Sequence, residues 1–506
     1  MVGAGIAGLC SALELVASGC RVTLLERAAA PGGKLRQNGA NGAAIDAGPT
    51  VFTLREVFEQ VFRSAGSRLE QHLQLRPLSI LARHAWGAGE TLDLHADSER
   101  SAAAIRDFAG AQEAAGYLRF CADSRRVYQT LDHSFMRASE PSLGGLVAHA
   151  GLRGLPDLFR LRAFSSLWRA LGAYFRDPRL RQLFGRYATY CGSSPFSAPA
   201  TLMLVAHVEQ DGVWLVDGGM HQIAAALAGL AAAKGAVFRY GAEVREVLTE
   251  GGRASGVVLA SGERIVADAV VVNADVAAVA AGMLGAGVAK ATPRIAPAQR
   301  SLSAVTWAMR VSASGFPLVR HNVFFSGDYE AEFRDIFRRG ALPGEPTVYV
   351  CAQDRDDGGS GAPNGAERLL CLVNAPASGD LRPFSASEIA QCEERMIRLL
   401  ARCGLTLEWA PERTAITTPE GFDRLFPATG GALYGQATHG AMASFRRPGA
   451  RTTVPGLYLA GGSTHPGPGV PMAALSGRLA AASVMADRTS SALSRPRAMR
   501  GGMSMR

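Results

Sequence analysis

The chain has 506 residues, of which 48% are hydrophobic and 19% are charged, and its formal net charge is +9. This length and composition exclude a mostly disordered chain and predict two or three structural units with hydrophobic cores. The positive charge suits an anionic membrane surface or a nucleic acid, but the basic residues are scattered and no nucleic-acid motif is present, so we expect no nucleic-acid partner.

The chain begins with MVGAGIAGLC, in which Gly3, Gly5 and Gly8 form the dinucleotide-binding pattern G-x-G-x-x-G. The residues from Gly8 to Gly19 are predicted to form a helix, and CRVTLLER then forms a buried strand that ends at Glu26. An acidic residue about 20 positions after the glycines binds the ribose hydroxyl in such sites. The pattern therefore predicts a nucleotide site.

Only Met1 and Val2 precede this pattern, whereas such a turn normally follows a strand of about five residues. We therefore expect either that the natural start lies upstream or that the chain is a truncated product. The loop PGGK (31–34) follows Glu26 directly. Its glycines would let the backbone approach a pyrophosphate, and Lys34 would neutralise it; the alternative is a plain turn with a solvated lysine.

Residues 111–207 are predicted to be largely helical. Within them, Arg153, Arg160, Arg162 and Arg169 alternate with Leu, Phe and Trp. This pattern resembles a basic amphipathic surface for the membrane interface. An ordinary helix that packs on the core and keeps its arginines in water remains the alternative.

Residues 236–275 are predicted to be a run of strands, with hairpin turns at Gly251-Gly252 and Ser261-Gly262. The last strand leads back towards the nucleotide-binding unit. A second G-x-G-x-x-G is not found, so one bound dinucleotide is expected. Residues 300–350 are again rich in predicted strands, which suit a substrate-binding sheet.

The segment VPGLYLAGGSTHPGPGVPMAALSGRLAA (454–481) predicts an apolar strand, a Gly/Pro loop and a helix. Pro471 fits the first turn of that helix, and the free N–H groups near Met472 would stabilise the negative charge of a reduced flavin. Gly462 permits close backbone approach. His465 is a candidate for positioning or packing as much as for a general base.

The eight cysteines are dispersed without C-x-x-C spacing and without a histidine at metal-ligand spacing, so we expect reduced thiols and no metal. We recognise no signal peptide and no apolar segment of the length that a membrane span needs. The last residues form a basic segment that is predicted to be disordered.

From end to end, the chain resembles bacterial carotenoid desaturases of the phytoene desaturase family. The resemblance rests on GAGIAGL, LLERAAAPGGKL, VWLVDGGMHQIAAAL and GLYLAGGSTHPGPGVPMAALSGR, in which T-H-P-G-x-G-[IV]-P is the most specific pattern. Within the family, DAGPTVFTLREVF, LFGRYATY, DGGMH and VYVCAQDR are most similar to the 1-hydroxycarotenoid 3,4-desaturases. SFRRPGAR departs from the F-R-P-H-N-R-D run of the phytoene desaturases.

The resemblance implies an α/β fold with a Rossmann-like FAD-binding domain of the glutathione-reductase and amine-oxidase type, an inserted mixed-sheet substrate domain and a helical subdomain. The residues implied to hold the ADP part of FAD are Gly3, Gly5, Gly8, Glu26 and Lys34. Those implied at the adenine and at the flavin are Val244, through its backbone, and Gly462 and Met472. The family usually has arginine near Lys34, so a point charge replaces a planar fork there.

The implied domains are discontinuous in sequence. They are an FAD-binding domain (1–75, 208–290 and 450–487), a substrate-binding sheet domain (76–110 and 291–449), a helical, membrane-associating subdomain (111–207) and a disordered tail (488–506). The implied partners are a long apolar carotenoid and a membrane surface. The implied location is the cytoplasm, peripheral to the inner membrane.

The implied reaction is FAD-dependent desaturation at C-3,4 of an acyclic 1-hydroxycarotenoid. No residue is identified as the catalytic acid or base, and the electron acceptor stays open. The alternatives are a phytoene desaturase, an FAD amine oxidase of the same fold and, less favoured, a non-enzymatic carrier of prenyl chains. Oxidation of added amines would favour the amine oxidase, and a purified protein without flavin would favour the carrier.

Overall fold

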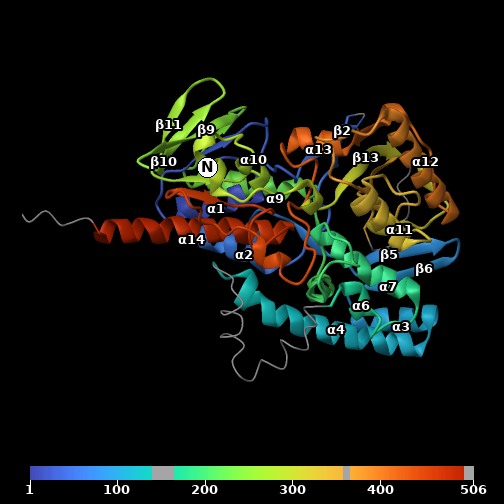
Figure 1. Cartoon of the computed structure of the whole chain (residues 1–506). Coiled ribbons are helices and arrows are strands. Elements are labelled where there is room, and N and C mark those ends of the chain that lie inside the picture. The colour runs from blue at the N-terminus through green and yellow to red at the C-terminus, as the bar shows by residue number, and fades with distance from the viewer. Residues whose placement is uncertain (41, 140–164, 357–364, 495–506) are drawn as a thin grey trace, which may run out of the picture.

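The first layer of the molecule is a parallel sheet assembled from distant parts of the chain. The computed structural model describes residues 1–506 except 41, 140–164, 357–364 and 495–506 (Figure 1). The strands of this layer are β1 (Thr23–Glu26), β8 (Val237–Tyr240), β12 (Val270–Val272) and β20 (Leu457–Leu459). β1 pairs with β8 and β12 pairs with β20, and Val2 bridges the two pairs through Leu25 and Val272. The predicted strand that ends at Glu26 is confirmed.

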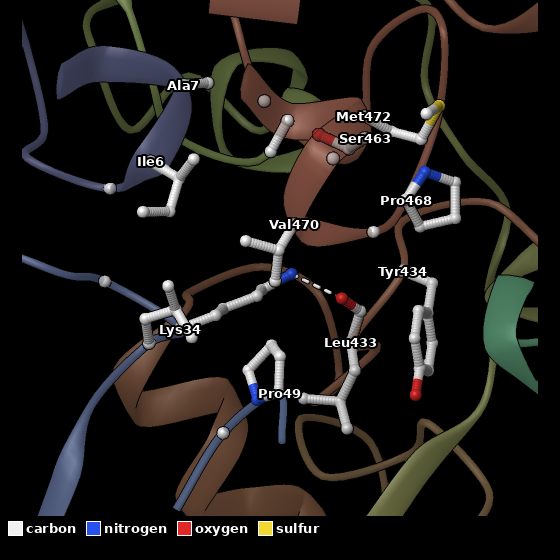
Figure 2. Close-up of a pocket in the computed structure, with 18 of the residues that line it drawn as sticks. Ile6, Ala7, Lys34, Pro49, Leu433, Tyr434, Ser463, Pro468, Val470 and Met472 are labelled. Carbon is white, nitrogen blue, oxygen red and sulfur yellow. Dashed lines mark hydrogen bonds between the residues drawn. The ribbon is translucent and has the colours of Figure 1, made fainter. Parts of the chain in front are cut away.

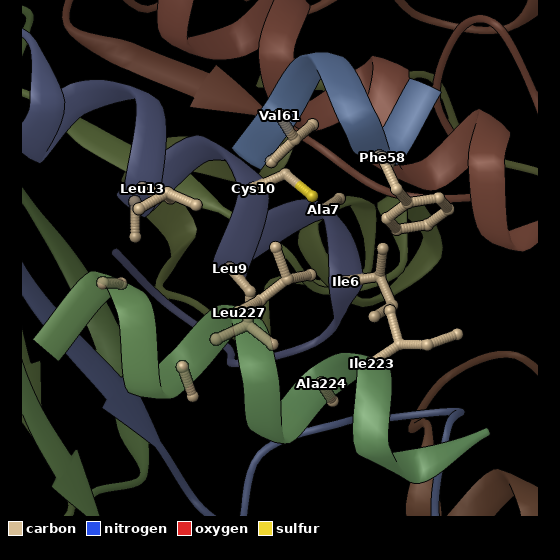
Figure 3. Close-up of a cluster of buried hydrophobic side chains, with 14 of the residues drawn as sticks. Ile6, Ala7, Leu9, Cys10, Leu13, Phe58, Val61, Ile223, Ala224 and Leu227 are labelled. Atoms are coloured by element: carbon tan, nitrogen blue, oxygen red, sulfur yellow. The ribbon is translucent and has the colours of Figure 1, made fainter. Parts of the chain in front are cut away.

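Four helices pack around this sheet and share one hydrophobic core. They are α1 (Ile6–Ala17), α2 (Arg55–Ser64), α9 (His221–Ala233) and α14 (Val470–Ser494). Helix α1 is mostly apolar, and nine of its twelve residues are buried between the others, as a largely apolar helix requires. Figure 3 shows Ile6 and Leu9 against Ile223 and Leu227 of α9, with Cys10 facing α2.

A three-stranded antiparallel sheet is inserted between β8 and β12. Its strands are β9 (Val244–Glu250), β10 (Arg253–Leu259) and β11 (Arg264–Val266). Gly251 and Gly252 connect β9 to β10 with φ angles of 55° and 76°, which side-chain-bearing residues rarely adopt. The predicted hairpin is therefore confirmed.

A larger mixed sheet of seven strands forms the second layer. In spatial order its strands are β19 (Thr414–Thr417), β13 (Ser303–Val311), β17 (Glu367–Ala375), β16 (Val348–Ala352), β15 (His321–Phe324), β5 (Ile80–Gly87) and β6 (Glu90–His95). Only β15 and β5 pair in parallel. Helix α12 (Ala386–Arg402) packs on this sheet, and its first turn is capped reciprocally by Ser385 and Glu388.

Helices dominate the described part of residues 111–207, as predicted. Those in and next to this segment are α3 (Ser98–Ala109), α4 (Ala111–Leu131), η2 (Asp132–Met136), α6 (Leu167–Leu171), α7 (Pro178–Gly185), η3 (Arg186–Cys191), η4 (Ala200–Met203) and α8 (Leu204–Gln210). Phe120, Phe175 and Phe184 lie at their centre with ring centroids 4.8–5.6 Å apart. This aromatic core holds the helices together, and because Leu92 and Leu94 of β6 and Val323 of β15 belong to the same cluster, it packs them on the large sheet.

The remaining elements are short connections. They are β2 (Gln37–Ala40), β3 (Ala43–Asp46), η1 (Leu69–Gln71), β4 (Leu75–Pro77), β7 (Trp214–Val216), α10 (Val276–Ala280), η5 (Ala286–Ala291), η6 (Pro297–Gln299), β14 (Ala313–Ser314), α11 (Tyr329–Arg334), η7 (Asp335–Arg339), β18 (Thr406–Leu407), η8 (Pro411–Arg413), α13 (Pro419–Leu425) and η9 (Ala443–Arg446). Every helix in the described part of the chain is too short or too polar to span a bilayer.

The C-terminal end differs from its prediction. Residues 488–494 are expected in a disordered tail, but helix α14 continues through them to Ser494. The alanine-rich segment before them has high helix propensity, and such a helix extends once its first turns are fixed by packing. Residues 495–506 lie outside the described residues, as do Arg153, Arg160 and Arg162 of the predicted membrane surface.

Gly477 sets how closely α14 approaches α1. A Cβ atom at Gly477 would lie 2.2 Å from the carbonyl oxygen of Ala7, and this backbone atom cannot yield without moving α1. We therefore expect Gly477→Ala to destabilise the protein by about 1–3 kcal/mol and to lower its melting temperature. Gly229→Ala on α9 is the matched control, because its Cβ meets no atom within 4 Å. Equal melting temperatures for the wild type and Gly477→Ala would contradict this packing.

Candidate functional site

A large cavity of about 1280 Å³ runs from the glycine pattern to the large sheet. Its walls come from the parallel sheet, helices α1 and α14, the helical segment and strands β13, β16 and β17. Seven of the eight candidate residues line it, namely Gly3, Gly5, Glu26, Lys34, Val244, Gly462 and Met472. Gly8 does not line it, so any role of Gly8 in binding is indirect.

The glycine turn is held in place by Asn273, a residue that the sequence patterns did not single out. A Cβ at Gly5 would lie 2.7 Å from Asn273 Oδ1, and a Cβ at Gly8 would lie 2.2 Å from the carbonyl oxygen of Gly3. The Gly8 N–H donates to Asn273 Oδ1 at 3.0 Å, and Asn273 Nδ2 donates to the Ala460 carbonyl at 2.8 Å. Gly8 thus serves the close packing of α1, while Gly3 and Gly5 face the cavity.

The two glycine-rich loops lie side by side. The Gly32 N–H donates to the Ala4 carbonyl at 2.8 Å, and a Cβ at Gly33 would lie 3.2 Å from the Gly5 Cα. The N-cap residue of α1, Gly5, supplies no side-chain cap, and Asn273 takes up the Gly8 N–H, while Ile6 and Ala7 of the first turn line the cavity. Uncapped backbone N–H groups at a helix N-terminus bind phosphate oxygens, so this edge fits a pyrophosphate.

Glu26 ends strand β1 with its carboxylate at the cavity wall. One carboxylate oxygen accepts the Ala4 N–H at 2.6 Å and the other accepts the Ala28 N–H at 2.8 Å. The side chain is 8% exposed, so these two bonds fix the carboxylate in one orientation. Each oxygen keeps a lone pair, which is the acceptor that a ribose hydroxyl requires. Val244, at the start of β9, lines the same end of the cavity.

Lys34 also lines the cavity and has a protein partner. Its Nζ donates to the Leu433 carbonyl at 2.6 Å, as Figure 2 shows, and lies 5.2 Å from the centre of the Phe426 ring. Burial lowers the pKa of Lys34. The ammonium faces the cavity with donors to spare, because one carbonyl satisfies only one of its three N–H groups.

The N-terminus of α14 forms another part of the wall. Gly462, Val470 and Met472 line the cavity there, and Pro471 occupies the predicted place in the first turn. His465 is not part of the lining. Its ring is 2% exposed and packs edge-on against Phe135 with 5.0 Å between ring centres. Burial lowers the pKa of His465 to about 4, so the ring is neutral near pH 7.

The residues present fit a flavin dinucleotide without metal ligands. The cavity offers uncapped N–H groups for a pyrophosphate, a carboxylate for a ribose and a second helix N-terminus beyond them. Among the described residues, no three acidic, histidine or cysteine side chains meet at a possible metal site. The cysteines are all free, and burial raises the thiol pKa of, for example, Cys191 to about 11.

Beyond the nucleotide end, the cavity is lined mainly by hydrocarbon. Leu202, Val205 and Val208 face it from η4 and α8, and Leu370 and Leu372 face it from β17. Polar side chains interrupt this lining, and those of Arg186 and Tyr190 on η3 and of Glu209 on α8 are among them. Sequence patterns missed them because they lie in an apparently ordinary helical segment.

We expect Asn273→Ala to lower both the melting temperature and the flavin content of the purified protein. The substitution leaves the Gly8 N–H and the Ala460 carbonyl without partners. Each unpaired buried group costs about 1–3 kcal/mol. Differential scanning fluorimetry and the flavin-to-protein absorbance ratio measure the two effects. Wild-type values for both would show that Asn273 does not hold the turn.

Glu26→Arg is expected to abolish retention of FAD, because it replaces the hydrogen-bond acceptor of the ribose by a cation. It also leaves the Ala4 and Ala28 N–H groups without their acceptor. Glu26→Gln keeps one acceptor oxygen and should retain part of the flavin. Glu250→Arg makes the same charge change at an exposed residue, the last of β9, and should retain all of the flavin. Flavin is measured by absorbance after gel filtration. Full occupancy in Glu26→Arg would rule out Glu26 as the ribose acceptor.

Solved structures show which fold this is. The chain matches putrescine oxidase bound to putrescine with a TM-score of 0.58 at 15% identity, over 96% of this chain and 98% of that one. An oxidoreductase from Methanosarcina mazei matches with a TM-score of 0.57 at 17% identity, over 96% and 99%. These similarities confirm the FAD-binding amine-oxidase fold with a mixed sheet and helices.

Relatives are similar in sequence over the whole length. Hydroxyneurosporene desaturases from Rubrivivax gelatinosus and Cereibacter sphaeroides are 58% and 48% identical, over 100% and 97% of this chain and 96% and 98% of theirs. A phytoene dehydrogenase from Streptomyces griseus is 33% identical, over 100% of this chain and 97% of its own. The model of the flavin-containing amine oxidoreductases matches residues 6–485. The chain therefore belongs to the flavin-containing amine oxidoreductase family and, within it, to the carotenoid desaturases.

Proposed function

We propose that this protein is an FAD-dependent desaturase that introduces the C-3,4 double bond into an acyclic 1-hydroxycarotenoid. The observation that carries the proposal is the identity of 45–58% to three hydroxyneurosporene desaturases over 97–100% of the chain. The identity to a phytoene dehydrogenase is lower, at 33%. The cavity supports the same activity, because a nucleotide end continues into a hydrocarbon-lined end.

The cofactor is FAD. In the proposed site, Glu26 holds the ribose, the first turn of α1 and Lys34 hold the pyrophosphate, and the backbone at Val244 meets the adenine. Gly462 and Met472, at the N-terminus of α14, lie at the flavin end. When bound, FAD would accept a hydride, which carries both electrons, and the second hydrogen would leave the substrate as a proton. The positive end of α14 favours negative charge at its end of the cavity.

The apolar walls bind and align the polyene. Burial of hydrocarbon supplies roughly 25 cal/mol per Å² of apolar surface relative to water, but a carotenoid starts from lipid, which is equally apolar. The net gain on transfer is therefore small, and the cavity contributes mainly by holding the reacting carbons in one register and by excluding water. Hydrocarbon walls from the helical segment and the large sheet suit that purpose, since they can contact a linear chain from more than one side.

The same reasoning supports a peripheral position on the membrane, at the cytoplasmic face of the inner membrane. A substrate dissolved in lipid reaches a protein cavity most directly where the protein contacts the bilayer. The net charge of +9 favours an anionic lipid surface. Arg169, on α6, is exposed and available for such a contact.

Expression in cells that accumulate hydroxylated acyclic carotenoids tests the activity. We expect a product with one more conjugated double bond, detected by chromatography with absorption spectra and mass loss of two hydrogens, and little conversion of phytoene. Glu26→Arg, which should lack flavin, is the negative control. Comparable conversion of phytoene would place the protein with the phytoene desaturases. Oxidation of amines with no action on carotenoids would make it an amine oxidase.

A further inference from the structure

One arginine in the hydrocarbon end of the cavity has too few partners. Four arginines line the cavity, namely Arg27, Arg36, Arg186 and Arg447. Arg447 donates to the carbonyls of Tyr434, Gly462 and Gln436, and Arg36 donates to Asn38 and Thr417. Arg27 donates to the Leu425 carbonyl near the protein surface. Arg186, deep in the cavity, is the exception.

The guanidinium of Arg186 makes one side-chain hydrogen bond to the described residues, to Tyr190 Oη at the long distance of 3.5 Å. It lies over the rings of Tyr190 and Tyr349, 5.4 and 5.3 Å from their centres. A guanidinium carries five N–H groups, so most of these donors remain for something in the cavity. Burying a cation with so few partners is costly unless a ligand completes the site.

An acceptor stands beside these donors. Tyr190 donates to one oxygen of Glu209, and Tyr187 donates to the other at 2.8 Å. The Glu209 side chain is 8% exposed and also lines the cavity. Burial raises the pKa of Glu209, while Arg186 and the two tyrosines oppose that shift. Arg186, Tyr190 and Glu209 thus offer both donors and acceptors inside hydrocarbon walls.

A hydroxyl group matches this set, because it donates one hydrogen bond and accepts others. A purely hydrocarbon substrate needs none of it and would leave the arginine unsatisfied. A cationic amine is disfavoured by the charge of Arg186, which acts at short range inside the protein. The chemistry of the three side chains therefore selects an uncharged oxygen function.

The position of Arg186 also fits the proposed reaction. The carbon that carries the hydroxyl is separated from the nearer reacting carbon by a single methylene, so the group that binds the oxygen must lie beside the reacting bond. Burial raises the pKa of Tyr434 to about 12, and the charge of the nearby Arg186 opposes that shift. Figure 2 shows Tyr434 beside Pro468, with Met472 beyond Pro468 at the N-terminus of α14, the proposed flavin end.

We propose that Arg186, with Tyr190 and Glu209, binds the tertiary hydroxyl of the substrate and determines the preference for hydroxylated over unsubstituted carotenoids. The inference rests on the proposed function and adds the residues that read the substrate. Arg186 donates to the hydroxyl oxygen, and the hydroxyl hydrogen is donated to Tyr190 Oη or Glu209. The ring of Tyr349 packs against the guanidinium of Arg186. The Tyr349 hydroxyl is hydrogen-bonded to Thr50 Oγ1 at 2.6 Å and to His321 Nδ1 at 2.7 Å.

The test compares kcat/KM for a 1-hydroxylated acyclic carotenoid and for its parent of equal chain length without the hydroxyl. Arg186→Leu should lower the value for the hydroxylated substrate by about 10- to 100-fold, as expected for loss of a charged hydrogen bond, and leave the parent unchanged or faster. Arg186→Lys keeps a donor but not the planar fork and should lose less. Glu209→Gln should also reduce the preference.

Arg181→Leu is the matched control. Arg181 belongs to the same helical segment as Arg186, and its guanidinium lies 4.7 Å from the centre of the Trp168 ring. Arg181 does not line the cavity. The substitution should leave the preference unchanged. Flavin content and melting temperature show whether each variant is folded. Binding of the hydroxylated product to the holoenzyme, followed by quenching of protein fluorescence, should weaken in Arg186→Leu more than binding of the product without the hydroxyl.

The outcomes separate the two proposals. If the wild type desaturates no carotenoid, the proposed function fails. If the wild type prefers the hydroxylated substrate and folded, flavin-loaded Arg186→Leu keeps the same preference in both rate and binding, the assignment of Arg186 fails and the function stands. Equal losses on both substrates would also overturn the assignment, because they would mean a general structural role.

Discussion

The whole site depends on the close approach of three chain segments around Asn273. Its backbone N–H donates to the Val2 carbonyl at 2.7 Å, and its side chain joins the N–H of Gly8 to the carbonyl of Ala460. The glycines beside it leave no room for a Cβ atom. Because this contact fixes the ends of β12 and β20 against the glycine turn, it brings the N-termini of α1 and α14 to one cavity. Helices α1 and α14 lie side by side in Figure 1.

The cavity has two chemically different ends, one lined by hydrogen-bonding groups and one lined mainly by apolar side chains. The nucleotide end presents backbone N–H groups, a fixed carboxylate and a lysine, which together suit an anionic, hydroxyl-rich ligand. The other end is hydrocarbon from two different layers, the helical segment and the large sheet. A polar side chain in that second end must be partnered or must serve a ligand, since burying it alone is costly. Arg447 is satisfied by three backbone carbonyls, whereas the guanidinium of Arg186 has donors left for a ligand.

Residue type alone is a poor guide to the chemistry of this site. His465 stands in the most specific sequence pattern, yet it packs against Phe135 outside the cavity lining and is neutral near pH 7. Lys34 faces the cavity but already donates to Leu433. Asn273 and Arg186 are more important to the site than their sequence context indicates. Asn273 joins separate chain segments, and the Arg186 guanidinium makes one long side-chain hydrogen bond to the described residues.

The sequence by itself determined the nucleotide-binding unit and the family. The glycine pattern, the strand that ends at Glu26, the hairpin at Gly251-Gly252 and the closing helix are local, so spacing and turn chemistry suffice to predict them. The resemblance supplied the fold class and the cofactor for the same reason, because its patterns are short and contiguous. Only the tertiary structure decided that Gly8 packs rather than lines the cavity, that Asn273 joins three segments and that Arg186 meets Tyr190, Glu209 and Tyr349. Those contacts join residues from separate elements, and hydrogen-bond satisfaction inside a cavity is a property of the packed whole that no local pattern encodes.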